Sequence, residues 1–349
     1  MTPPTERFIV LSMNAEPDTV APLTPPANAP NAIGDRPHHP DHHDPVISVR
    51  GLVKRYGHRE AIHGIDLDVY HGEIFAFLGP NGAGKTTTVE ILEGFRERTE
   101  GEVRVLGVDP GHAGAAWRDR VGVVLQESEP EPGLSVRECL GLYAGYYSAP
   151  RGIDETIALV GLTEKAGTLA SELSGGQRRR LDVALALIGD PDVVFLDEPT
   201  TGFDPSARRN AWAVIAGLRD LGKTVFLTTH YMDEAEYLAD RIAVLVEGRI
   251  VAEGTPRTLG GRDRMTAAIR FTLPDGLTLA DLPSGLRPLA EPGPDGTTRI
   301  RSECPLVHVQ MLADWALGRG NDLPDLDVRR PTLEDVYLEL TSPPAQEAR

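Results

Sequence analysis

Hydrophobic and polar positions alternate along two stretches that begin near residue 46, and a continuous apolar run follows them. Residues 46–56 (VISVRGLVKRY) and the first part of residues 62–79 (IHGIDLDVYHGEIFAFLG) alternate, as strands with one buried face do. The run EIFAFL that follows is apolar throughout, which is typical of a central strand buried on both faces. The pattern predicts an antiparallel β portion followed by a central strand.

Four more apolar segments predict further strands: residues 121–126 (VGVVLQ), 192–199 (DVVFLDEP), 223–230 (KTVFLTTH) and 241–254 (RIAVLVEGRIVAEG). Helical stretches separate most of them, and this alternation favours parallel strands joined by crossover helices. From residue 127 to about residue 190 the sequence is mainly helical, with stretches such as SVRECLGLYAGYY and IDETIALVGL. We therefore expect an α/β core that contains an inserted helical subdomain.

The pattern changes at both ends of this core. Residues 1–45 are rich in Pro, Ala, Asp and His with almost no aliphatic periodicity, so a disordered tail is expected there. Beyond residue 261, short apolar segments and Pro- and Gly-rich turns such as EPGPDG predict a small α/β C-terminal domain over residues 262–349. The core would occupy residues 46–261.

The tail contains four closely spaced histidines: His38, His39, His42 and His43. Imidazoles that lie close together can share a transition-metal ion. A solvated low-complexity stretch explains the same composition without a ligand, and this second interpretation is the favoured one.

Composition narrows the possible classes of function. With 35 basic and 52 acidic residues the formal net charge is -17, which argues against nucleic acid or anionic lipid as a general partner. Cys139 and Cys304 have neither metal-ligand nor redox spacing, so a reducing cytoplasm fits. No apolar run reaches the roughly 20 residues that span a bilayer, and the N-terminus shows no secretory signal pattern. Any membrane span is expected to come from another chain.

A glycine-rich loop connects the predicted central strand to a helical stretch, TTTVEILEGF. The loop sequence GPNGAGKTT matches the pattern G-x-x-x-x-G-K-[ST]. Its backbone N–H groups and the helix N-terminus can surround phosphate oxygens. A glycine-rich turn with an incidental lysine is the alternative, and the order strand, loop, helix argues against it. The residues expected to contact nucleotide are Gly79, Pro80, Asn81, Gly82, Ala83, Gly84, Lys85, Thr86 and Thr87.

Two acidic residues, Asp197 and Glu198, end the predicted strand DVVFLDEP, where open α/β sheets usually bind ligands. By analogy with P-loop NTPases, Lys85 of this chain would reach the β- and γ-phosphates, while Thr86 and Asp197 would hold Mg²⁺. Glu198 is suited to polarise the attacking water as a general base. A solvated turn is the alternative for an isolated acid pair, and the phosphate loop upstream favours the catalytic interpretation.

The motif LSGGQ, at residues 173–177, precedes a long helical stretch. Ser174, Gly175 and Gly176 could form a second anion-binding helix start. Serine is also a favoured N-cap that needs no ligand. Both interpretations stay open when the motif is considered alone.

Together the three motifs resemble, in order and spacing, the ATP-binding subunit of ATP-binding cassette (ABC) transporters over about residues 47–260. The resemblance implies a P-loop NTPase cassette, with a mixed sheet, a parallel core, an antiparallel β portion and an inserted helical subdomain. It implies ATP and Mg²⁺ as cofactors, and a homodimer or heterodimer in which Ser174, Gly175, Gly176 and Gln177 close over the partner's ATP. Integral-membrane permease subunits would hold the protein at the inner face of the cell membrane.

Four further residues match family positions. Tyr56 matches the aromatic residue that stacks on adenine, although a tyrosine that ends a strand is often only a surface anchor. Gln126 matches the glutamine that contacts Mg²⁺ and the attacking water. Asp204 is expected to help set the dimer contact, in a loop where Phe203 replaces the usual leucine. His230 matches the histidine that contacts the γ-phosphate and orients the catalytic residues.

The resemblance implies hydrolysis as well as binding, because Glu198 and His230 are both present. The expected catalytic residues are Glu198, His230, Gln126 and Lys85. The expected magnesium ligands are Thr86, Gln126 and Asp197.

Three longer stretches, LSGGQRRRLDVALALIGDP, TTHYMDEAEYLADRIAVL and PTLEDVYLELT, are similar to the branch that contains the daunorubicin-resistance exporter subunit. That branch commonly carries a short C-terminal domain, expected here to be regulatory or to support the dimer. The resemblance implies export of a drug, antibiotic or other hydrophobic compound. The alternative is an ABC ATPase with a role outside transport. Such proteins generally carry two cassettes or a long coiled coil, whereas this chain shows one cassette and no sustained heptads.

Overall fold

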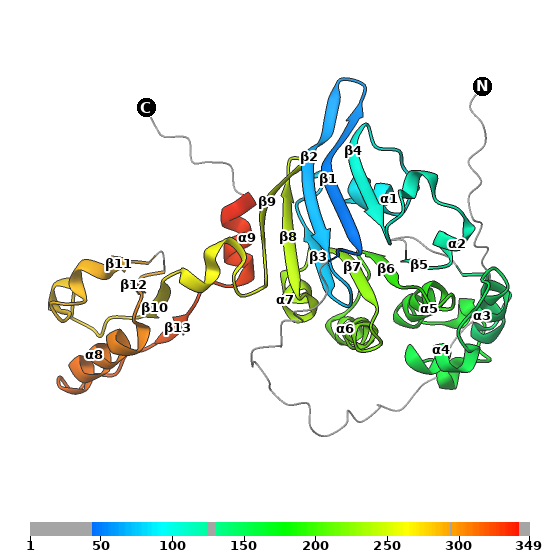
Figure 1. Ribbon diagram of the computed structural model, residues 1–349. Helices are drawn as coiled ribbons and strands as arrows, with labels where there is room; N and C mark the ends of the chain where they lie inside the picture. The colour runs from blue at the N-terminus through cyan, green and yellow to red at the C-terminus, as the bar shows by residue number, and fades with distance from the viewer. Residues whose placement is uncertain (1–43, 125–129, 294, 342–349) are drawn as a thin grey trace. The chain divides into compact units, whose positions relative to one another are not determined.

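The computed structural model describes residues 44–124, 130–293 and 295–341 (Figure 1). Almost all of the predicted tail, with its four histidines, and the predicted magnesium ligand Gln126 lie outside the described residues. The chain divides into two compact units between Val251 and Ala252, inside a strand, whereas the sequence pattern placed the change after residue 261. No helix in the described ranges is both long enough and apolar enough to span a bilayer.

Three antiparallel strands form the β portion predicted for the start of the core. β1 (Ile47–Tyr56) lies between β2 (Arg59–Val69) and β4 (Glu100–Val105). A Cβ atom added at Gly101 would lie 2.4 Å from the backbone oxygen of Gly51, where the register of β1 and β4 shifts. Glycine is therefore required where these two backbones approach one another.

A six-stranded sheet in the order β5-β6-β7-β3-β8-β9 forms the centre of the first unit. Its strands are β3 (Ile74–Leu78), β5 (Val121–Val124), β6 (Val193–Asp197), β7 (Thr224–Thr229), β8 (Arg241–Val246) and β9 (Arg249–Gly254). The pairs β5/β6, β6/β7, β7/β3 and β3/β8 are parallel. A two-residue turn at Glu247 and Gly248, both with positive φ, joins β8 to β9 as a hairpin. The predicted mixed sheet with a parallel core is confirmed.

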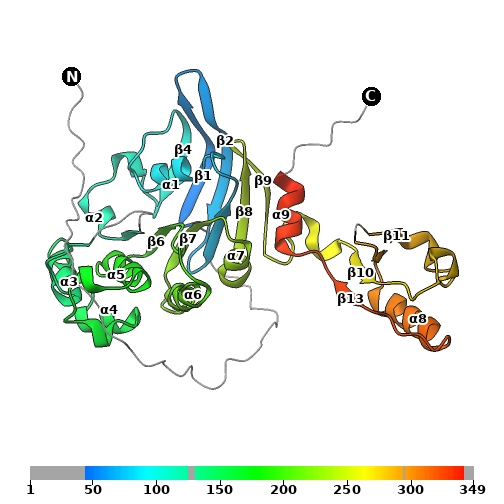
Figure 2. The same cartoon turned by 180° about the vertical axis from the view of Figure 1, so that it is seen from behind.

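Alternate residues of the central strands belong to different hydrophobic cores. Val194 and Leu196 of β6 pack with helices on one face, while Val193 and Phe195 pack on the other. The first face carries α5 (Gly175–Leu187), α6 (Pro205–Asp220) and α7 (Met232–Leu238), as Figures 1 and 2 show. The second face carries α1 (Lys85–Leu92), α2 (Ala115–Arg118) and the antiparallel strands. The sheet is thus covered on both faces, which explains its continuously apolar strands.

The helical insertion predicted between β5 and β6 contains α3 (Val136–Ala144) and α4 (Ile153–Leu159), and both pack with α5. Ser135 begins α3 with a capping box: its side chain accepts from Glu138 N at 3.3 Å, and Glu138 Oε2 accepts from Ser135 N at 2.8 Å. This reciprocal pair satisfies N–H groups that the helix itself leaves free. Leu140 and Ile157 are buried in the shared core.

The second unit contains an antiparallel sheet in the order β11-β12-β10-β13. The strands are β10 (Ala267–Phe271), β11 (Ala290–Pro292), β12 (Thr298–Ser302) and β13 (Asp327–Arg329). Phe271 and Ile300 pack with Leu312 and Trp315 of α8 (Pro305–Leu317). A second helix, α9 (Leu333–Thr341), ends the described chain. This unit has its own core and is of mixed α/β composition, as predicted.

Candidate functional site

The glycine-rich loop between β3 and α1 has a backbone that only glycine permits at several positions. Gly82 and Gly84 have φ values of +79° and +109°. A Cβ atom at Gly79 would lie 2.3 Å from the backbone oxygen of Leu245, and one at Gly84 would lie 2.9 Å from that of Ala61. The loop is thus fixed by close backbone approach from β8 and β2. Backbone that carries no side chains can also approach a phosphate group closely.

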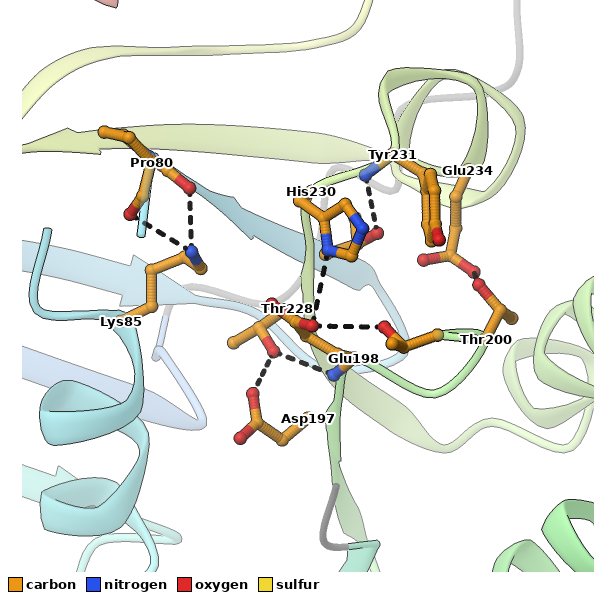
Figure 3. A network of polar contacts seen from close by, with 12 residues as sticks. Pro80, Lys85, Asp197, Glu198, Thr200, Thr228, His230, Tyr231 and Glu234 are labelled. Carbon is orange, nitrogen blue, oxygen red and sulfur yellow. Dashed lines mark hydrogen bonds and ion pairs between the residues drawn. The ribbon is translucent and has the colours of Figure 1, made fainter. Parts of the chain in front are cut away.

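Lys85 begins α1 and is almost completely buried. Its Nζ donates hydrogen bonds to the backbone oxygens of Gly79 at 2.7 Å and Pro80 at 3.3 Å (Figure 3). Burial lowers the pKa of this ammonium, while the negative charges of Glu198 and Asp197 act in the opposite direction. A buried cation at a helix N-terminus, inside a glycine loop, fits a phosphate ligand.

The acid pair lies at the end of β6, as predicted, and a threonine of the neighbouring strand holds both residues. Asp197 is the last residue of β6 and pairs with Thr228 in the sheet register. Thr228 Oγ1 donates a hydrogen bond to Asp197 Oδ1, and the same oxygen accepts from Glu198 N at 3.0 Å. Glu198 has a φ of +45°, in the left-handed region. Such a conformation in a non-glycine residue costs about 1 kcal/mol or more and needs support of this kind.

His230 and the acid pair lie together at one edge of the sheet. His230 Nδ1 lies 3.3 Å from Glu198 Oε2 (Figure 3), and Thr201 Oγ1 donates a hydrogen bond to the same oxygen at 3.1 Å. His230 immediately follows β7, which runs parallel to β6. Two strands that end at the same edge therefore bring the histidine and the carboxylate into contact. This arrangement can orient a carboxylate toward a water molecule.

The described oxygen donors at this edge fit magnesium. Asp197 provides a carboxylate. Thr86, an exposed residue in the first turn of α1, provides a hydroxyl. It directly follows Lys85, whose positive charge interacts with the Asp197 carboxylate. Hard oxygen ligands of this kind, completed by water and phosphate oxygens, are those that Mg²⁺ uses. Gln126, the third predicted ligand, lies outside the described residues.

Tyr56 lies beside the helix that follows the phosphate loop. Its hydroxyl is 3.4 Å from Thr87 Oγ1. Lys54 Nζ and Arg96 Cζ lie 5.2 Å and 5.4 Å from the centre of its ring, which is partly exposed. An exposed aromatic ring next to the phosphate loop is consistent with the predicted contact to adenine.

The LSGGQ motif forms the capped start of α5. Gln177 N donates to Ser174 Oγ at 3.3 Å, and Ser174 N donates to Gln177 Oε1 at 3.0 Å. Ser174 thus caps α5, and the anion-binding interpretation of the motif stays a prediction; Ser174 and Gly175 are exposed. Within the described residues, no hydrogen bond or ion pair joins the side chains of this motif to Lys85 or to the acid pair.

Asp204 caps the next helix, α6. Its carboxylate accepts hydrogen bonds from Ser206 N at 2.8 Å and Ala207 N at 2.9 Å, and these bonds lower the pKa of Asp204. The side chain is exposed, in the loop that follows Glu198.

Sequence reasoning did not identify Thr228, Arg179 or Glu234. Arg179, a buried residue of α5, donates to the backbone oxygens of Pro199 at 3.0 Å and Asp197 at 3.1 Å. Thr228 could have been found by its place two residues before His230 on a strand parallel to β6. Arg179 could not, because nothing in the sequence distinguishes it from its neighbours Arg178 and Arg180.

Comparisons with known proteins agree with this geometry. A family model described as ABC transporter matches residues 62–201. A second model, described as ABC transporter domain-containing protein-like, C-terminal domain, matches residues 267–332.

Two curated relatives span most of the chain. The daunorubicin resistance ATP-binding protein DrrA3 of Streptomyces coeruleorubidus is 38% identical over 309 residues, covering 85% of this chain and 96% of its own length. The Nod factor export ATP-binding protein I of Ralstonia nicotianae is 44% identical over 309 residues, covering 85% of this chain and 94% of its own length.

Solved structures match about three fifths of the chain. The dimeric structure of a post-hydrolysis state of an ATP-binding cassette bound to ADP and Pi has a TM-score of 0.54 and 25% identity, and covers 60% of this chain and 98% of that chain. CbiO1 from Clostridium perfringens, part of an ABC transporter complex, has a TM-score of 0.56 and 26% identity, and covers 61% of this chain and 90% of that chain.

Proposed function

The chain belongs to the family of ABC transporter ATP-binding proteins, and we propose that it hydrolyses ATP to drive transport through separate membrane subunits. The observation that carries the proposal is the contact of Glu198 with His230 at the sheet edge that also bears Asp197, whose charge acts on Lys85 of α1. A chain that only binds nucleotide needs the loop and the lysine. It does not need a carboxylate held by both a histidine and a threonine.

Each residue then has a defined task. The loop from Gly79 to Thr87 binds the phosphates through its backbone, and Lys85 turns from the loop carbonyls to the β- and γ-phosphates. Glu198 accepts a proton from the attacking water, and His230 keeps the Glu198 carboxylate directed toward it. Mg²⁺, held by Thr86, Asp197 and Gln126, would offset the negative charge of the phosphates.

We place two such sites in a head-to-tail dimer. Ser174, Gly175, Gly176 and Gln177 of each subunit would contact the γ-phosphate held by the other, and Asp204 would line the same interface. The exposure of Ser174 and Gly175 supports this arrangement, as does the dimer seen in a similar ATP-binding cassette. Closure on ATP and reopening after hydrolysis would transmit work to the membrane subunits.

The proposed direction of transport is export. The two relatives above are named for daunorubicin resistance and Nod factor export, which supports a drug, antibiotic or other hydrophobic cargo. Integral-membrane permease subunits would recognise that cargo and hold this protein at the inner face of the cell membrane. Co-purification with a membrane protein encoded by a neighbouring gene tests the partnership, and failure of every such neighbour to bind would contradict it.

Hydrolysis is tested with the Glu198→Gln variant. The amide has no basic carboxylate for the water, so the rate of ATP hydrolysis should fall about 10²- to 10⁴-fold while ATP binding is retained and a closed dimer accumulates. Phosphate release and ATP affinity are measured with Mg²⁺ and with a chelator, which should abolish turnover in the unmodified protein.

The matched control is Glu164→Gln, which changes an exposed carboxylate of the helical insertion and should keep the original rate. An unchanged rate in Glu198→Gln would remove the role assigned to Glu198.

A further inference from the structure

A buried carboxylate with no assigned role lies close behind the catalytic edge. Glu234, in the first turn of α7, has no exposed surface. Burial raises the pKa of this carboxyl, while the hydrogen bonds it accepts act in the opposite direction. Burying a carboxyl group is costly unless its hydrogen bonds offset the loss of water. The hydrogen bonds that Glu234 accepts therefore indicate its structural role.

One oxygen of Glu234 connects three segments. Glu234 Oε1 accepts a hydrogen bond from Thr200 Oγ1 at 2.7 Å and another from Trp212 Nε1 at 2.8 Å. Thr200 stands in the loop that begins at Glu198 (Figure 3), and Trp212 stands in α6. Glu234 itself, in α7, lies four residues after His230. The loop of the general base and the loop of the histidine are thus tied to one atom.

Aromatic contacts hold α6 and α7 together around this atom. The Arg208 guanidinium of α6 lies 3.9 Å from the ring centre of Tyr231, the residue after His230. The rings of Trp212 and Tyr237 are stacked with centres 5.2 Å apart. These contacts fix the position of α7, so that Glu234 can hold Thr200 at a defined place.

We infer that Glu234 is a positioning residue, which holds the loop of Glu198 in register with the loop of His230 through its hydrogen bonds to Thr200 and Trp212. The inference rests on the proposed hydrolytic function. The contact that Glu234 would maintain is the one between His230 Nδ1 and Glu198 Oε2, which are 3.3 Å apart. A small displacement of either loop lengthens this contact without altering the phosphate loop.

Three variants of the full chain test the inference. Glu234→Ala removes the acceptor, and Thr200→Val removes one donor at nearly constant volume. Each should lower kcat at least about tenfold, because small displacements of reacting groups are costly. The KM for ATP should stay within about threefold, because the phosphate loop is untouched. Glu234→Gln keeps an oxygen acceptor for both donors and should restore most of the activity.

The double variant Glu234→Ala/Thr200→Val tests whether Glu234 acts on the loop of Glu198 through Thr200. If Glu234 acts through Thr200, the double variant should lose no more kcat than Glu234→Ala alone. The control is Leu238→Ala, which removes a buried side chain from the same helix and should lower Tm while the folded protein keeps its kcat.

Opposite results overturn the inference. These are a kcat in Glu234→Ala or Thr200→Val within about twofold of the unmodified protein, or a Glu234→Gln variant as inactive as Glu234→Ala. If Glu234→Ala does not fold, Thr200→Val and Glu234→Gln decide. No hydrolysis by the unmodified protein would instead reject the proposed function, so the two failures are distinguishable.

Discussion

Glu93, at the end of α1, has a pKa far above the ordinary value of a glutamate side chain. Its side chain is buried, and burial raises its pKa to about 8, with the nearby negative charges of Asp197 and Glu90 adding to the effect. The carboxyl is therefore protonated over much of the neutral pH range in the folded protein. In the unfolded chain it ionises near its ordinary value of 4.5.

This difference predicts a pH-dependent stability. Between about pH 4.5 and pH 8 the folded protein binds more protons at Glu93 than the unfolded chain, so stability falls as pH rises, by up to about 1.4 kcal/mol per pH unit. Glu93→Gln cannot ionise and avoids this loss. Its Tm relative to the unmodified protein should rise as the pH is raised from 5 to 8, measured without nucleotide or metal.

Glu97→Gln, which changes an exposed residue a few positions further on, is the matched control. A Tm difference for Glu93→Gln that stays constant with pH would show that Glu93 ionises normally in the folded protein.

Residues that form motifs could be predicted from the sequence, and residues defined by burial could not. Lys85, Asp197 and His230 are recognisable because each belongs to a short sequence motif at or just after the end of an apolar strand. Glu93 and Glu234 resemble surface acids in the sequence, and only the packing of α1 and α7 makes them buried. The expectations for Tyr56 and Asp204 as ligand and dimer contacts stay predictions.

At the scale of elements, the strands that alternate or are continuously apolar were predicted well, because burial on one or two faces leaves a direct pattern. The order β5-β6-β7-β3-β8-β9 was not predictable, since it depends on which strands pair across long sequence distances. β11 and β13, with three residues each, are too short to show a period.

Close packing of elements predicts opposite effects for two glycines. In Gly122→Ala, a Cβ on β5 would lie 2.5 Å from the backbone oxygen of Ala186 in α5, so the variant should lose about 1–3 kcal/mol of stability. In Gly217→Ala, inside α6, the new Cβ has no neighbour within 4 Å, and the variant should gain about 0.5–1 kcal/mol.

Thermal unfolding of both variants, measured side by side with the unmodified protein, checks the prediction. A Gly122→Ala variant as stable as the unmodified protein would mean that β5 and α5 lie further apart than described.

At the scale of the whole molecule, the sequence predicted a cassette followed by a smaller domain, and both have a core of their own. The partners could not be predicted from composition or periodicity, because a subunit interface leaves no simple period in one chain. The exposed residues Ser174, Gly175 and Asp204 indicate an interface only through the family resemblance.

The central claim is that each ATP site combines the phosphate loop of one subunit with the LSGGQ motif of the other. Lys85→Ala disables a phosphate loop, and Ser174→Arg blocks an LSGGQ motif. Heterodimers of differently tagged chains can be purified by two successive affinity steps, so that each variant pairing is assayed alone.

The rate of ATP hydrolysis by the Lys85→Ala/Ser174→Arg heterodimer is the most direct measurement. One intact composite site remains in it, so the account predicts recovery to as much as about half of the unmodified rate, although each variant homodimer is inactive. An unmodified chain paired with a chain carrying both changes should be inactive, because neither composite site is intact. Activity in that second pairing and none in the first would contradict the account.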